Sequence, residues 1–258
     1  MKPDECRGRS ECDSPPAAGA GAGARTGAGT GESRTGSLTL DDGHMARLIE
    51  LIVALRPMET RQQREFGMLL YRLLSRGRPV TSAELARELG GDPGEVQRMA
   101  GEFACFTETS EAGEIVGFGG LSVVPTRHSF TLPDAALFTW CAWDALFIPE
   151  VLGRTARVTS PSPVTGREIR LTIAPGEITH AEPAGAALSM VLPPLQALRQ
   201  DVRSSFCGQV HFFGSADEAR EWAAARREAY VATLDQGMRL GRLKNAAQFG
   251  DLLPTTGP

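Results

Sequence analysis

Two stretches near the start of the apolar part of the chain repeat hydrophobic side chains at helical spacing. In MARLIELIVALR and RQQREFGMLLYRLLSRG, leucine, isoleucine and methionine return every third or fourth position. That spacing places the apolar side chains on one face of a helix that packs against a core. The pattern predicts two amphipathic helices, with ordered structure beginning near Leu40.

The next segment, PVTSAELARELGGDPGEVQRMAGEF, predicts a short helix, a tight turn and a second helix. Thr81 or Ser82 can cap the first helix, and the Gly-Gly pair ends it. Asp92 and Pro93 suit the start of the second. The alternating run EIVGFGGLSVVPTRHSFTL follows, as strands would. We therefore expect a winged helix-turn-helix-like domain over residues 43–132.

The pattern changes after Pro133. DAALFTWCAWDALFIPEVLG predicts one helix that starts near Asp134 and ends before Gly153, whereas RTARVTSP, REIRLTIAP and QVHFFGS are typical of short strands. SADEAREWAAARREAYVATLDQGMRL is helical again, with Ser215 as a candidate cap. We expect an α+β fold, in which the winged-helix-like domain precedes a second domain at 133–258 with short antiparallel strands.

Residues 1–42 differ from the rest of the chain. Their Gly/Ala-rich run PPAAGAGAGARTGAGTGESRTGS offers almost nothing to bury, which predicts a disordered tail. No apolar run approaches the roughly 20 residues of a membrane-spanning helix, and no apolar stretch follows the charges of the amino terminus. We therefore expect a cytoplasmic protein that has no membrane partner.

Charge argues against a nucleic-acid partner for the helix-turn-helix. The formal net charge is −4, and residues 45–132 hold ten arginines and no lysine against eleven aspartates and glutamates. The second helix offers Arg98 as its one cation. DNA affinity depends on neutralising phosphates, so this domain is better suited to packing than to reading DNA. A thiol-based metal-sensing transcriptional regulator remains the alternative function.

The run FTWCAWDALF places Cys141 and Asp144 three positions apart among apolar neighbours. Positions i and i+3 of a helix share a face, with Cβ atoms about 5–6 Å apart, so a thiol and a carboxyl could meet there. An unpaired carboxylate among tryptophans and leucines would be costly. The alternative is that Cys141 is a buried cysteine that packs as a small hydrophobic residue, and that Asp144 is exposed to solvent.

The five cysteines form an odd, scattered set, unlike a secreted disulfide framework, so we expect thiols in a reducing compartment. Cys207 is predicted to begin a strand in RSSFCGQVHFFGS. A zinc ion shared with His211 is disfavoured, because strand positions i and i+4 lie about 13 Å apart. Two thiolates select soft ions such as Hg(II) or Cu(I), and a nearby carboxylate can accept a thiol proton.

Three blocks, in order, carry a family resemblance: WCAWDALFIPEVLGRTARVTSPSPVTG, LTIAPGEITHAEPAGAALSMVLP and DVRSSFCGQVHFFGS. They closely resemble the organomercurial lyases (alkylmercury lyases), densely from about Leu137 to Trp222. The resemblance extends back to about His44, where that family also carries a winged-helix-like domain. It implies protonolysis of carbon–mercury bonds to a hydrocarbon and Hg(II), as part of mercury detoxification, without an organic cofactor.

The resemblance implies that Cys141, Asp144 and Cys207 are catalytic and hold the mercury of substrate and product. One thiolate would attack mercury, the second would raise its coordination, and Asp144 would carry a thiol proton to the departing carbon. Cys141 is favoured as the source of that proton, whereas the order of attack stays open. The family further implies external low-molecular-weight thiols for turnover and transfer of Hg(II) to a mercuric reductase.

The chain departs from the family at several positions. Ser162 stands where many relatives have a third cysteine, and Gly208 where many have a cysteine after the one that matches Cys207. Phe138 replaces a common tyrosine, and Trp143 a smaller aliphatic residue. These changes could alter stability, Hg(II) transfer or the organic-group pocket. A protein that only sequesters mercury would use the cysteines without needing the aspartate.

Overall fold

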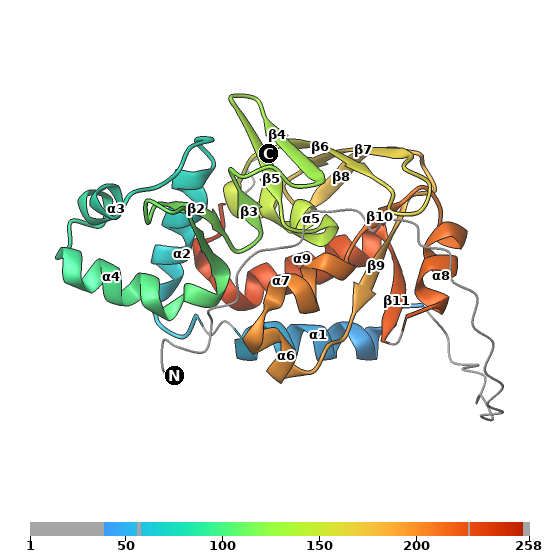
Figure 1. Ribbon diagram of the computed structural model, residues 1–258, viewed down its shortest axis with the longest axis horizontal. Coiled ribbons are helices and arrows are strands. Elements are labelled where there is room, and N and C mark those ends of the chain that lie inside the picture. The colour runs from blue at the N-terminus through green and yellow to red at the C-terminus, as the bar shows by residue number, and fades with distance from the viewer. Residues whose placement is uncertain (1–38, 56–57, 227, 255–258) are drawn as a thin grey trace, which may run out of the picture.

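The computed structural model describes residues 39–55, 58–226 and 228–254 (Figure 1). Most of the predicted tail, residues 1–38, lies outside the described residues. Leu40 is fully buried, and its N–H donates to the carbonyl of Val231 at 2.9 Å. The folded part therefore already includes Leu40, where the sequence predicted that order begins.

Helices make up much of the amino-terminal part and the carboxyl end of the described chain. The α-helices are α1 (Asp42–Leu55), α2 (Arg61–Leu74), α3 (Ser82–Leu89), α4 (Pro93–Glu102), α5 (Ala142–Leu152), α6 (Leu195–Gln200), α7 (Val202–Ser205), α8 (Ala216–Ala224) and α9 (Leu234–Phe249). Short 3-10 turns are η2 (Ala104–Phe106), η3 (Cys207–Gln209) and η4 (Gly250–Leu252).

The predicted helix ends of the amino-terminal part are confirmed. The side chain of Thr81 caps α3 by accepting from the N–H of Glu84, and Gly90 ends that helix with a left-handed φ of 61°. Asp92 caps α4 in the same way. These caps satisfy backbone groups that a helix end leaves unpaired. The local sequence therefore fixes the two short helices and the turn between them.

Two antiparallel sheets complete the α+β fold. The strands are β1 (Thr107–Thr109), β2 (Ile115–Phe118), β3 (Leu121–Ser122), β4 (His128–Leu132), β5 (Ala135–Thr139), β6 (Ala156–Pro161), β7 (Glu168–Ala174), β8 (Glu177–Glu182), β9 (Ala187–Val191), β10 (Phe212–Phe213) and β11 (Ala229–Thr233). The large sheet has the order β1-β2-β3-β5-β4-β6-β7-β8, and the small sheet β10-β9-β11.

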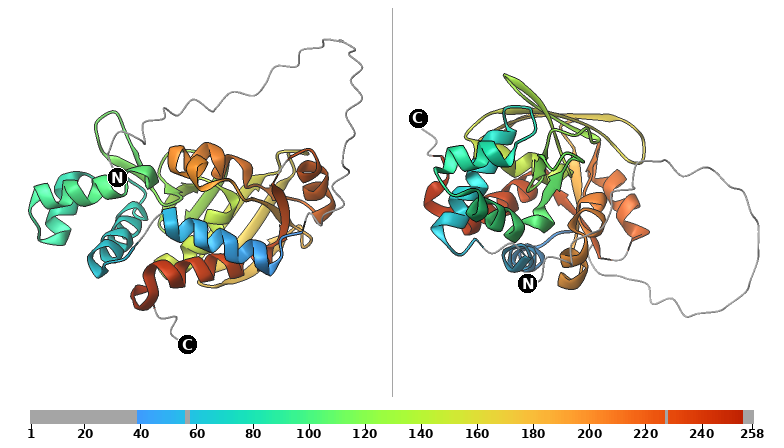
Figure 2. Two further views of the ribbon diagram at one scale, coloured as in Figure 1. Left: turned by 90° about the horizontal axis from the view of Figure 1, so that it is seen from below. Right: turned by 60° about the vertical axis from the view of Figure 1, so that its left-hand side comes forward.

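Helix α5 lies in the interior, between the large sheet and α9 (Figure 1). Nine of its eleven residues are buried, which fits its almost uniformly apolar sequence. Helix α1 lies alongside α9 on the outer side (Figure 2). The second half of the stretch that the sequence analysis singled out, from Ala142, therefore belongs to the central helix of the molecule.

The prediction of one helix from near Asp134 is wrong. Residues 135–139 form β5, which pairs with both β4 and β3, and the helix begins only at Ala142. Leu137 and Thr139 are buried while Ala136 and Phe138 are less so, which is the period of a strand. Pairing on both sides therefore overrides the local helical pattern.

Two other assignments also differ. The predicted helical run after Ser215 contains strand β11 between α8 and α9, because its YVAT segment pairs with β9. Strands β8 and β9 were not predicted at all.

The predicted domain boundary at Pro133 falls in the turn between β4 and β5, and the large sheet continues across it.

In the described part of the chain, no helix combines the length and the apolar character needed to cross a bilayer.

Candidate active site

Cys141 lies at the junction between β5 and α5, just before the helix begins. Its backbone is extended (φ −145°, ψ 172°), as expected of an N-cap residue, and Asp144 is the third residue of the helix. The Oδ2 atom of Asp144 accepts a hydrogen bond from the Cys141 N–H at 2.9 Å. The two residues therefore meet through helix capping, and the expectation that both lie within one helix is corrected.

Cys207 begins the 3-10 turn η3 directly after α7, and not the strand that the sequence predicted. Asp201 caps α7 by accepting from the N–H of Ser204, which favours helix over strand in this segment. The N–H of Ala142 donates to the carbonyl of Val210 at 3.1 Å. This bond joins the two cysteine segments close to both thiols.

The three predicted residues come together in the interior. Cys141, Asp144 and Cys207 each offer one ligand atom, and these atoms all lie within 4.8 Å of one another. Their exposed fractions are 0%, 6% and 6%. Among the residues that the structure describes, they form the one cluster of three potential metal ligands. Two thiols and a carboxyl this close can share one soft ion.

Aromatic residues directly precede Asp144 and Cys207 in the sequence and pack against each other. Trp143 packs edge-on against Phe147 and Phe206, with ring centroids 5.0 and 5.9 Å away. Its indole N–H donates to the carbonyl of Gly237 at 3.0 Å, which fixes the ring. All three rings are buried. They form a buried apolar contact between the segments that carry Asp144 and Cys207.

Gly120 leaves the space that the carboxyl of Asp144 occupies. A Cβ atom built on Gly120 would lie 2.4 Å from the Cγ of Asp144, and its φ of +101° is one that other residues rarely adopt. The Gly120 carbonyl also accepts from the Trp140 N–H at 2.8 Å. The chain passes so close to Asp144 that this position requires glycine.

Both thiols are held in their neutral form. Burial, a hydrogen bond with Cys207 and the charge of Asp144 raise the pKa of Cys141 well above its ordinary value of 9.0. The hydrogen bond with Cys141 lowers the pKa of Cys207, but burial and the charge of Asp144 outweigh it, so this pKa is also raised. Thiolate formation here needs a proton acceptor or a bound cation.

The remaining cysteines differ. Cys6 and Cys12 lie outside the described residues, while Cys141 and Cys207 are free. Cys105 is half-buried and disulfide-bonded in the structure, contrary to the expectation that every cysteine is a thiol.

Two buried histidines were predicted to be structural rather than ligands. His128 lies 2.9 Å from the hydroxyl of Ser160, and His211 lies 3.5 Å from a guanidinium nitrogen of Arg127. Burial lowers the pKa of His128 to about 3 and that of His211 to about 4. Both are neutral at pH 7, and neither belongs to the thiol–carboxyl cluster.

Ser162 and Gly208, where the family often has cysteine, have local structural roles. The Ser162 hydroxyl donates to Glu218 and accepts from the N–H of Val164 at 3.1 Å, which fixes the turn after β6. A Cβ on Gly208 would lie 3.3 Å from the Arg203 carbonyl, a tight contact. Ser162 thus serves the turn, and Gly208 allows close packing against α7.

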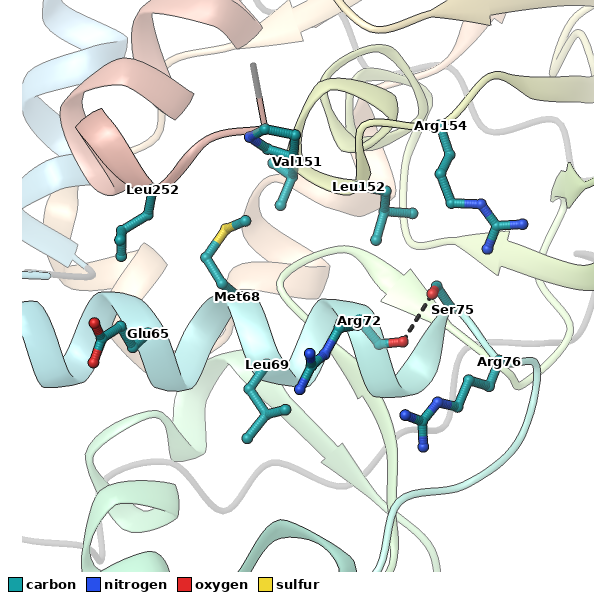
Figure 3. A pocket seen from close by; sticks show the side chains of 11 residues that line it. Glu65, Met68, Leu69, Arg72, Ser75, Arg76, Val151, Leu152, Arg154 and Leu252 are labelled. Carbon is teal, nitrogen blue, oxygen red and sulfur yellow. Dashed lines mark hydrogen bonds between the residues drawn. The ribbon is translucent and has the colours of Figure 1, made fainter. Parts of the chain in front are cut away.

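A cavity of about 540 Å³ lies away from the cluster, between α2, the end of α5 and the carboxyl-terminal segment (Figure 3). Apolar side chains such as Met68 and Leu69 form part of its wall, and Arg72, Arg76 and Arg154 line one side. None of the three predicted site residues lines it. The buried cluster and this cavity are therefore separate features of the molecule.

Sequence reasoning missed the residues that surround the cluster without belonging to a motif. Gly120 was visible only as part of the Gly-Gly pair in GFGGLS, which signals a turn but not a neighbour. Glu108 and Arg203 form an ion pair of 2.9 Å across 95 positions of sequence. No local signal reveals such a contact.

Comparison with known proteins agrees with the resemblance read from the sequence. The family model described as "MerB: Alkylmercury lyase" matches residues 121–244. The alkylmercury lyase of Streptomyces lividans is 41% identical over 186 residues, which cover 72% of this chain and 84% of that protein. The alkylmercury lyase of Staphylococcus epidermidis is 36% identical over 188 residues, covering 73% and 84%.

A solved structure has the same fold. The crystal structure titled as the mercury-bound form of MerB2 superposes with a TM-score of 0.64 at 24% identity, covering 77% of this chain and 96% of that one. The identity and coverage of the relatives, over the segment that carries the cluster, show that this chain belongs to the alkylmercury lyase family.

Proposed function

We propose that this organomercurial lyase cleaves carbon–mercury bonds by protonolysis at Cys141, Asp144 and Cys207. The observation that supports this assignment is the convergence of two buried thiols and a carboxyl, with ligand atoms within 4.8 Å of one another. Cleavage needs two soft nucleophiles on one mercury atom and a proton for carbon, and these three groups can supply both.

The reaction balances with these groups alone. An organomercury halide or thiolate R–Hg–X and two cysteine thiols give R–H, a mercury bis-thiolate, H⁺ and X⁻. Cys141 transfers its proton to Asp144, the Cys207 proton leaves together with X⁻, and both sulfurs bind mercury. The added sulfur donation weakens the carbon–mercury bond and makes the carbon basic. Asp144 then protonates that carbon, so the hydrocarbon leaves while Hg(II) stays on the sulfurs.

Burial explains why the carboxyl matters in this scheme. Both thiols have raised pKa values, so neither forms a thiolate readily at neutral pH. A carboxylate next to Cys141 gives the proton a destination during attack, and the same proton is then in place for the carbon. All three groups are buried, which limits the access of bulk water during the proton transfer.

Product release requires other thiols, because two protein sulfurs hold Hg(II) tightly. External low-molecular-weight thiols can exchange with the protein thiolates through mixed mercury complexes. A mercuric reductase is the partner that the family implies for the released ion. Cys141 and Cys207, which are both free in the structure, must stay reduced for turnover.

We also propose that residues 43–132 form a winged-helix-like unit that supports the domain at 133–258. Helices α2 to α4 are followed by the antiparallel pair β1–β2, and an isolated bridge joins Val80 to Ile115. Arg98, the arginine of α4, is paired with Glu102. A helix whose cation is already neutralised suits packing and not a nucleic-acid partner.

Hydrocarbon release tests the proposal. We expect purified wild-type protein to release benzene from phenylmercury, to retain one Hg(II) when no external thiol is added, and to turn over repeatedly with excess cysteine. The Cys207→Ser variant should release no benzene above the uncatalysed rate. Mercury retention without benzene from the wild type would instead indicate a protein that sequesters mercury.

A further inference from the structure

We propose that Glu108, in β1 of the amino-terminal part, is a positioning residue that holds the two cysteine segments together. This inference rests on the proposed function, because it assigns Glu108 to the spacing of Cys141 and Cys207. The single carboxylate contacts the residue just before one cysteine and the helix just before the other.

The Glu108 side chain can reach Trp140 because the residue opposite Glu108 in the sheet is a glycine. Glu108 pairs with Gly117 in the ladder between β1 and β2. A Cβ on Gly117 would lie 2.8 Å from Oε2 of Glu108 and 3.2 Å from the indole nitrogen of Trp140. The missing side chain therefore makes the contact between Glu108 and Trp140 possible.

One oxygen of Glu108 binds the segment of Cys141. Its Oε2 accepts from the Trp140 indole N–H at 3.1 Å, and from the Ser122 hydroxyl at 3.3 Å. Trp140 directly precedes Cys141 and is 9% exposed. Fixing the indole therefore fixes the backbone from which the Cys141 side chain extends.

The other oxygen binds the segment of Cys207. Its Oε1 accepts from the Arg203 guanidinium at 2.9 Å. Arg203 lies in α7, four positions before Cys207, and its guanidinium lies 5.3 Å from the centroid of the Trp140 ring. Glu108 thus connects both segments at one point.

Because the ion pair between Glu108 and Arg203 is partly exposed, it contributes more to the geometry of the site than to the free energy of folding. The Glu108 side chain is 20% exposed and that of Arg203 is 40% exposed. Ion pairs with this much solvent contact contribute little to folding. Two sulfurs must, however, reach the same mercury atom, and a displacement of about 1 Å in a reacting group can cost a large factor in rate.

The test compares Glu108→Gln with Glu111→Gln, an exposed acid in the neighbouring turn. Glutamine keeps an oxygen for Trp140 but removes the charge that holds Arg203. We expect kcat for benzene release to fall roughly tenfold in Glu108→Gln, with KM changed less than about threefold. Its bound Hg(II) should exchange faster with an added dithiol. The Glu111→Gln variant should match wild type in both assays.

A double-mutant cycle with Arg203→Met completes the experiment. If Glu108 acts by holding Arg203, the double variant should be no slower than the slower single variant. Wild-type rates and Hg(II) exchange in Glu108→Gln, or additive losses in the double variant, would overturn the inference while leaving the proposed function intact. A wild-type protein that releases no benzene would overturn the proposed function itself.

Discussion

At the scale of single residues, the site depends on the absence of a side chain at Gly120. The carboxyl of Asp144 occupies the position where a Cβ on Gly120 would lie. The same glycine accepts the Trp140 N–H just before Cys141. The Asp144 carboxyl and the backbone before the Cys141 thiol are thereby kept in place by close backbone contact.

The Gly120→Ala variant should therefore displace the carboxyl of Asp144. We expect benzene release to fall at least about tenfold, because the proton carrier leaves its position while both sulfurs remain. Gly113→Ala is the matched control, since Gly113 also has a positive φ (+78°) but a Cβ on it would meet no other atom within 4 Å. Equal losses in the two variants would point to backbone strain instead of Asp144.

The raised thiol pKa values predict how stability depends on pH. Because burial raises the pKa of Cys141 in the folded state, the folded state favours the protonated thiol. That stabilisation is complete below the ordinary thiol pKa of 9.0 and is lost as pH rises further. Urea unfolding from about pH 7 to about pH 10 under reducing conditions should show a steeper loss for wild type than for Cys141→Ser. An equal loss of unfolding free energy with pH in wild type and Cys141→Ser would contradict the raised pKa of Cys141.

At the scale of elements, the start of α5 brings the cysteine and the aspartate together. Cys141 is extended as the N-cap, and Asp144 accepts its N–H from within the first turn. The carboxyl thus has a structural task as well as its proposed chemical one. An anionic side chain in the first turn also suits the helix dipole.

Two neutral variants of Asp144 separate these tasks. Asn keeps an oxygen that can accept the Cys141 N–H, whereas Ala does not. We expect Asp144→Ala to be less stable than Asp144→Asn by about 1 kcal/mol, the usual contribution of such a cap. Chemical denaturation of both variants measures the difference. Equal stabilities would show that the capping bond contributes nothing to folding.

This element also shows what the sequence could and could not predict. The residue types of FTWCAWDALF and the ordered family blocks identified Cys141, Asp144 and Cys207, and the structure places them together. Local capping signals at Thr81 and Asp92 were also sufficient to predict where α3 and α4 begin. The strand β5 was missed because its state depends on pairing with β3 and β4. Contacts between distant segments leave no local pattern.

At the scale of the whole molecule, the amino-terminal helices support the site through the sheet. The large sheet runs from β1 to β8 without a break at the predicted domain boundary. Tyr71, fully buried in α2, donates its hydroxyl hydrogen to the carbonyl of Gly119 at 2.7 Å. Gly119 precedes the glycine that accommodates Asp144, so α2 is connected to the active site by one hydrogen bond.

The Tyr71→Phe variant tests this connection. Removing the hydroxyl takes a donor from the buried carbonyl of Gly119, which should lower the free energy of unfolding by about 1–2 kcal/mol. We also expect a reduced kcat for benzene release, because the turn that faces Asp144 is less well fixed. Thermal unfolding and steady-state kinetics measure the two effects. A stable variant with wild-type kcat would show that α2 does not influence the site.

The central claim is that Asp144 carries the proton to carbon while the two cysteines hold mercury. The most direct measurement is single-turnover benzene release from phenylmercury, comparing wild type with Asp144→Asn. The account predicts that both proteins bind mercury through Cys141 and Cys207, that wild type releases one equivalent of benzene, and that the variant is slower by at least about 100-fold. Benzene release by Asp144→Asn at the wild-type rate would contradict it.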